Sequence, residues 1–149
     1  MIEVDERFEV AAPPATVWQV VADPYAIVGC VPGAAIVSQN DDGSLETSLR
    51  VKFGPLNVAF QANTTLELDE VAMRGRLVAR GRDKQGGARF TASADFQVSA
   101  TETGSLVTAR GQVEISGRLA SLIEGGANVV VKRMADDFAN CLRARAEGR

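Results

Sequence analysis

The sequence contains no histidine, which removes the commonest general base and metal ligand of proteins. Its two cysteines, Cys30 and Cys141, lie far apart without a CxxC spacing, so they predict neither a zinc site nor a disulfide framework. We therefore expect reduced thiols in a cytosolic protein, with Cys141 as a small core residue. Because no Ser–base or Cys–His pair can be assembled, the sequence predicts no catalytic residues and no metal site.

Positive charge is not in excess either. The chain has 16 Lys and Arg against 19 Asp and Glu, a net charge of −3, so nucleic acid is not an expected partner.

No run reaches the ~18 apolar residues that span a bilayer, and the charged residues 1–10 do not resemble a secretory signal. At 149 residues, 46% of them hydrophobic, the chain predicts a single domain, which we place at residues 1–147.

Alternation of apolar and polar residues predicts β-strands along most of the chain. It covers residues 2–10, 45–53, 58–68, 73–82, 90–98 and 107–115. After the first strand, residues 14–22 favour a short helix that ends before Pro24, and residues 25–30 allow one more helical turn. From Leu119 to Leu142 the apolar residues recur at three- and four-residue steps, which predicts one long helix.

The predicted order is one strand, two short helices, about six further strands and a long helix that Gly125–Gly126 interrupts and bends. This order indicates an α+β fold in which a single antiparallel sheet buries one face under the long helix.

Small residues crowd the face of the later strands that points toward the helix. They are Ala62, Gly75, Ala79, Gly81, Ala92, Ala94, Ala109 and Gly111. Either the helix approaches the sheet unusually closely, or the sheet curves away and leaves a cavity. We favour the cavity, because Gly125–Gly126 and the bulky apolar stripe of the helix argue against close approach along its whole length.

The lining of that cavity would be apolar and would select a hydrophobic ligand, at roughly 0.8 kcal/mol per buried methylene. The predicted ligand-binding residues are Val28, Val31, Pro32, Phe60, Leu77, Phe90, Ala92, Phe96, Ala109, Leu122, Ile123, Val130 and Met134. The uncharged segment Pro24–Asn40 is broken by Gly29, Pro32 and Gly33, and we interpret it as a lid at the open end.

Five motifs resemble the CoxG family of carbon monoxide dehydrogenase subunits. They are FEVAAPPATVWQVVADP (8–24), CVPGA (30–34), VKFGP (51–55), GRDKQGG (81–87) and VEISGRLASL (113–122), in the order of that family and over nearly the whole chain. The resemblance implies the helix-grip fold of the SRPBCC superfamily. That superfamily includes START lipid-transfer domains, plant pollen-allergen-like proteins and polyketide cyclases.

The same resemblance implies a non-catalytic accessory protein that helps a molybdenum hydroxylase associate with the inner face of the cytoplasmic membrane. It implies no cofactor beyond a bound quinone-like or lipid-like molecule. Some members continue into an apolar C-terminal segment that can act as a membrane anchor. This sequence stops at Arg149, so we expect at most peripheral contact of a cytoplasmic protein with the membrane.

Two other functions remain open: a small cyclase or hydratase acting on an apolar carbonyl compound through Glu6, Tyr25 or an arginine, and a structural adaptor with a filled core. We expect Trp18 in the core rather than stacked on a ligand, and Glu6 in a solvated position near the strand end. Four arginines would form a salt-bridged outer stripe, with docking of a partner or of anionic lipid heads as the second possibility. The arginines are Arg74, Arg76, Arg80 and Arg82, and their predicted partners are Glu67, Asp69, Asp95 and Glu114.

Overall fold

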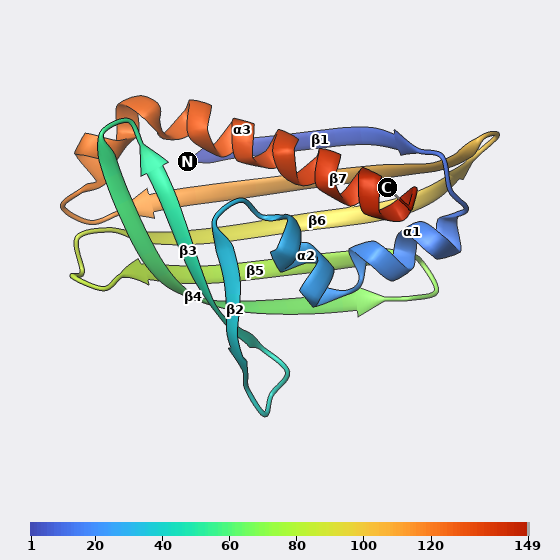
Figure 1. Ribbon diagram of the computed structural model, residues 1–149, viewed down its shortest axis with the longest axis horizontal. Helices are drawn as coiled ribbons and strands as arrows, with labels where there is room; N and C mark the ends of the chain where they lie inside the picture. The colour runs from blue at the N-terminus through green and yellow to red at the C-terminus, as the bar shows by residue number, and fades with distance from the viewer. Residues whose placement is uncertain (149) are drawn as a thin grey trace.

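Seven antiparallel strands form one curved sheet with the order β1-β7-β6-β5-β4-β3-β2, and three helices lie against one of its faces (Figure 1). The computed structural model describes residues 1–148. Its elements are β1 (Ile2–Val10), α1 (Pro14–Val21), α2 (Pro24–Cys30), β2 (Ala34–Gln39), β3 (Leu45–Phe53), β4 (Leu56–Asp69), β5 (Arg74–Asp83), β6 (Arg89–Thr101), β7 (Gly104–Ser116) and α3 (Ala120–Ala146). The predicted α+β helix-grip fold is confirmed.

Local sequence explains the short helices that follow β1. Pro14 occupies the first turn of α1, and Pro24 occupies that of α2, where its missing N–H breaks no helical hydrogen bond. The carboxylate of Asp23 accepts a hydrogen bond from the backbone N–H of Tyr25 at 2.9 Å and so caps α2. The chain then turns at Gly33, whose φ is +81° and where a Cβ would collide with the carbonyl oxygen of Arg50. Glycine is therefore needed to bring β2 against β3.

β2 is the first of the six later strands, and alternation did not locate it. Its residues Ala34 and Ile36 are half-buried, whereas Ala35 and Val37 are exposed. All four are small or apolar, so the sequence shows no contrast between the two faces. Its position at the edge of the sheet leaves one face and one side open, which relaxes the usual pattern.

α3 runs without interruption through Gly125–Gly126, so the predicted break in the helix was wrong. Ile123 is fully buried and Ala127 is 4% exposed, and these two contacts anchor the helix on both sides of the glycines. A Cβ at either glycine would meet nothing within 4 Å, so both face open space. Tertiary packing outweighs the low helix propensity of glycine here.

Most of the buried apolar residues form two separate clusters at opposite ends of the sheet. One surrounds Trp18 on α1 and includes Leu142 of α3, together with residues from β1, β6 and β7. The other surrounds Ile123 near the start of α3 and includes Phe53 and Phe60 of β3 and β4. The middle of the sheet therefore lies between two packed ends rather than inside one continuous core.

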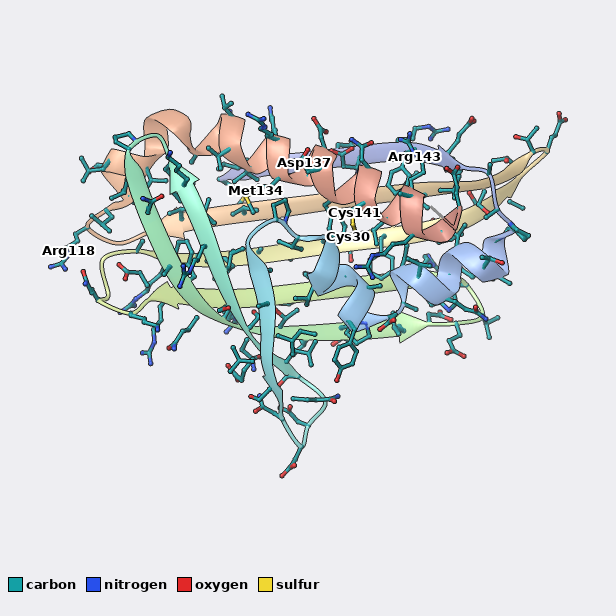
Figure 2. All side chains as sticks on the ribbon, in the orientation of Figure 1. Cys30, Arg118, Met134, Asp137, Cys141 and Arg143 are labelled. Atoms are coloured by element: carbon teal, nitrogen blue, oxygen red, sulfur yellow. A yellow bond between two sulfur atoms is a disulfide. The ribbon has the colours of Figure 1, made fainter. Side chains whose placement is uncertain are left out.

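The fold joins Cys30, the last residue of α2, to Cys141 of α3 in a disulfide, so the expectation of two reduced thiols was wrong (Figure 2). Their Cα atoms are 5.5 Å apart, within the range a disulfide requires, although 111 residues separate them in sequence. Spacing along the chain gave no hint of this pairing, because only the packing of α2 against α3 creates it.

Candidate functional site

A cavity lies between the sheet and the helices, in the gap between the two core clusters. One part of about 240 Å³ faces β3, β4 and β5, and a second part of about 260 Å³ extends toward β6, β7 and α3. The residues that line both parts are Ile27, Val31, Leu77, Ala92, Val113, Val131 and Met134. Because they share this wall, the two parts form one elongated space, which has the size of a small-molecule site.

Small side chains on neighbouring strands create the hollow, as predicted. Ala79 on β5 lies opposite Ala92 on β6, and Ala94 on β6 lies opposite Gly111 on β7. Ala79, Ala92 and Ala94 are half-buried rather than buried, although they point toward the helices. The space above them is therefore open instead of being filled by a closely packed helix.

Gly75 and Gly81 were expected to leave empty space in the cavity, but each has an aromatic ring over it. A Cβ at Gly75 would collide with the ring of Phe96, and a Cβ at Gly81 would collide with the ring of Phe90. Each glycine thus accommodates the aromatic ring opposite it on β6. The two rings lie down on the sheet and become part of the cavity wall.

The structure places seven of the thirteen predicted ligand-binding residues in the cavity wall. They are Val28, Val31, Leu77, Phe90, Ala92, Phe96 and Met134. Ligand binding by these residues stays a prediction.

The other six predicted residues lie outside the wall: Pro32, Phe60, Ala109, Leu122, Ile123 and Val130. Phe60 and Ile123 fill a core cluster, against which Val130 packs, and the side chain of Leu122 is 70% exposed. Pro32 is in the turn after α2, and Ala109 lies opposite Glu6 and Phe96. The cavity side of α3 at this turn was predicted one residue too early, since Val131 rather than Val130 faces the cavity.

Thr47 and Thr64 lie in the wall on the β3–β4 side, and neither was among the predicted ligand-binding residues. The hydroxyl of Thr47 donates a hydrogen bond to the carbonyl oxygen of Ala62, at 3.4 Å. The hydroxyl of Thr64 has no hydrogen-bond partner among the described residues. The inward position of Thr64 in the β4 alternation was the available signal.

The Pro24–Asn40 segment lies against the cavity. Ile27 and Val28 of α2, Val31 after it and Ala34 of β2 all contribute to the wall. A smaller hollow of about 160 Å³ adjoins the cavity near Pro24 and is bounded by β4 and the β2–β3 turn. The disulfide at Cys30 fixes the end of α2 to α3, so this covering segment is tied to the long helix.

Trp18 and Tyr25 do not line the cavity. Trp18 is 7% exposed and belongs to a core cluster, with its ring centroid 6.2 Å from that of Phe96. Tyr25 is 56% exposed at the start of α2. The prediction that Trp18 is a core residue is confirmed.

Glu6 on β1 is half-buried where this strand contacts α3, whereas the sequence favoured a solvated position. Its pKa is raised from 4.5 to about 7, first by burial, then by a hydrogen bond to Asp136 and by the negative charges of Asp136 and Asp5. Glu6 on β1 and Asp136 on α3 thus face each other across the β1–α3 contact. Neither of them lines the cavity.

We expect this pair to make stability depend on pH. The folded state binds a proton at Glu6 more tightly than the unfolded state does, so the free energy of unfolding should fall as the pH rises from about 4.5 to 7. Because the pair is partly exposed, solvent screening limits the loss to about 1 kcal/mol. Urea unfolding of Glu6→Gln should lack this fall and should exceed the wild type in stability at pH 8. Glu3→Gln, on the outer face of the same strand, should retain the wild-type profile.

The family of the chain follows from a comparison with known families. The model for CoxG, a family of carbon monoxide dehydrogenase subunits, matches residues 7–147. The chain belongs to the CoxG family. Sequence comparison with curated proteins gives no match.

Solved structures share the fold of this CoxG family member at low sequence identity. A conserved protein from Geobacillus kaustophilus is 14% identical, with a TM-score of 0.82 over 97% of this chain and 94% of that one. A START superfamily protein from Mycobacterium smegmatis is 18% identical, with a TM-score of 0.61 over 98% and 97%. The Zhui aromatase/cyclase from Streptomyces is 17% identical, with a TM-score of 0.63 over 99% and 94%. These likenesses establish the START-like fold alone.

No helix within residues 1–148 combines the length and the apolar character required to cross a bilayer.

Proposed function

We propose that this protein is a non-catalytic accessory protein that holds a quinone-like or lipid-like molecule in its cavity. In this role it helps a molybdenum hydroxylase to associate with the cytoplasmic membrane. The observation that carries the proposal is an apolar cavity in a member of the CoxG family. Membership of that family supports an association with carbon monoxide dehydrogenase or a related enzyme.

The chemistry of the wall supports a hydrophobic occupant. Aliphatic and aromatic side chains form most of it, so each methylene that a ligand buries contributes roughly 0.8 kcal/mol. The hydroxyl of Thr64 can donate to a carbonyl oxygen in the ligand. A flat apolar ring bearing a carbonyl group, as in a quinone, satisfies both features.

The positions of the candidate acid–base groups favour a non-catalytic role over a cyclase. Glu6 faces Asp136 rather than the cavity, and Tyr25 is exposed at the start of α2. The arginines of β5 lie on the outer face of the sheet. A cyclase requires acids and bases within hydrogen-bond reach of its substrate, and none of the residues proposed for that chemistry is in the wall.

The proposal predicts that a hydrophobic molecule co-purifies with the protein. Denaturing extraction with organic solvent, followed by mass spectrometry, should release a quinone or lipid in an amount comparable to that of the protein. The control is the variant Ala92→Phe, which fills the cavity and should yield much less. A protein that releases no such molecule and binds no apolar probe would instead be a structural adaptor.

A further inference from the structure

Five cations gather at the end of the molecule where β5 turns into β6, three of them on the outer face of the sheet and two in neighbouring turns. We define the basic patch as Arg80, Arg82, Lys84, Arg89 and Arg118, all of which are exposed. Arg82 and Arg89 lie directly opposite each other on β5 and β6, and Arg80 shares their face. Arg118 joins them because the neighbouring Leu119 N–H donates a hydrogen bond to the carbonyl of Gly87, at 2.7 Å, in the β5–β6 turn. Figure 2 shows Arg118 at that end of the molecule.

The predicted salt bridges do not neutralise this patch. Among the described residues, ion pairs join Arg76 to Asp95 at 3.0 Å and Arg110 to Asp5 at 3.6 Å, and neither includes a patch residue. Of the four acidic partners predicted from the sequence, only Asp95 forms an ion pair within residues 1–148.

Among the side chains that the structure describes, the acidic residues near the patch form no ion pair with it. Asp83 accepts hydrogen bonds from the backbone N–H groups of Gln85 and Gly87 within the turn. Glu114 on β7 lies diagonal to Arg89, opposite Thr91, and forms no ion pair with it among the described residues. Like charges directly opposite each other on neighbouring strands destabilise a sheet. The Arg82–Arg89 pair therefore has a cost that no ion pair in the described part of the chain offsets.

Positive charge is also segregated within the chain. Residues 8–49, which contain α1, α2 and β2, include no Lys or Arg, and the net charge of the whole protein is −3. The helices lie on the face of the sheet opposite to the patch. The protein thus presents a positive outer face at one end, whereas the segment 8–49, part of which lines the cavity, carries no positive charge.

We propose that the basic patch docks on the anionic phospholipid headgroups of a membrane surface. The proposal rests on the membrane association in the proposed function and names the surface responsible for it. Protein–protein interfaces centre on apolar anchors. The exposed large apolar side chains among the described residues lie outside the patch, and only Leu122 is within four residues of one of its members. Charge without an anchor suits headgroups, where each Lys or Arg strengthens binding about fivefold.

Vesicle co-sedimentation at low salt tests the proposal with the whole 149-residue chain. The protein should bind vesicles made of phosphatidylglycerol and phosphatidylcholine and should dissociate from them as the salt concentration rises. It should not bind vesicles of phosphatidylcholine alone. The double variant Arg82→Gln/Arg89→Gln should bind the anionic vesicles about 25-fold more weakly. Its matched control, Arg7→Gln/Arg74→Gln, removes the same charge from the other end of the outer face and should stay within about twofold of the wild type.

Several results would overturn the patch as a membrane surface. They are equal loss of binding in both double variants, unchanged binding in Arg82→Gln/Arg89→Gln, or failure of the wild type to bind anionic vesicles. In the last case, retention on immobilised polyglutamate would identify an acidic protein as the partner instead. Binding of the hydrocarbon probe diphenylhexatriene reports on the cavity separately. A protein that binds anionic vesicles but not diphenylhexatriene would refute the carrier function, while the assignment of the basic patch to the membrane would still hold.

Discussion

Reduction of the Cys30–Cys141 disulfide is expected to lower the free energy of unfolding by about 4 kcal/mol. The bond closes a chain segment of 111 residues, and a cross-link over that length greatly restricts the unfolded ensemble. Urea unfolding with and without a reductant should show the loss as a lower midpoint, with a steeper slope because the reduced unfolded chain is less compact and exposes more surface. Trp18, the only tryptophan and a core residue, supplies the fluorescence signal.

The same reduction should also loosen the cover of the cavity. α2 contributes Ile27 and Val28 to the wall, and its last residue carries the disulfide. Uptake of diphenylhexatriene should therefore be faster in the reduced protein. The double variant Cys30→Ala/Cys141→Ala should behave like the reduced protein and should not respond to the reductant. Identical unfolding midpoints for the oxidised and reduced wild type would show that the bond contributes nothing to stability.

The fold was predictable because its signals are local. Alternation along β3 to β7 and the three- and four-residue steps of α3 each depend on neighbouring residues. The cavity was predictable for a related reason. The side chains of Ala79, Ala92 and Ala94 are small whichever strands lie next to one another. The Pro24–Asn40 segment beside the cavity could be located because it is a long uncharged run, although Gly29 does not interrupt α2, and its role as a lid stays a prediction. Each of these inferences used residue size or polarity and required no knowledge of the strand order.

What escaped prediction depends on contacts between distant segments. The disulfide needs α2 to pack against α3, and the raised pKa of Glu6 needs burial where β1 meets α3 and, second, the neighbouring Asp136. The choice of Val130 over Val131 as a cavity residue failed because an apolar stripe gives the buried side of a helix only to within a residue or so. The wide apolar stripe of α3 faces both the core clusters and the cavity between them. Sequence periodicity cannot tell which residues of the stripe face the core and which face the cavity.

Ala92→Phe should weaken binding of an apolar ligand by at least about 100-fold while leaving the protein folded. Ala92 lines both parts of the cavity, so a phenyl ring there would occupy the space where they meet. The displaced ligand would lose the burial of several methylene-sized groups, at roughly 0.8 kcal/mol each. Since the ring enters an existing hollow, we expect stability to change by less than about 1.5 kcal/mol. Titration with diphenylhexatriene and urea unfolding measure the two effects.

Two further variants separate a blocked cavity from a damaged sheet. Ala59→Phe adds the same ring on the exposed outer face of β4 and should bind the probe as the wild type does. Thr64→Val keeps the shape of the side chain but removes its free hydroxyl, which should weaken a naphthoquinone by about five- to tenfold, the contribution of one neutral hydrogen bond. The hydrocarbon probe has no oxygen, so its affinity should not change in Thr64→Val. Equal losses for both ligands would mean that Thr64 acts through packing, and undiminished probe binding in Ala92→Phe would place the ligand elsewhere.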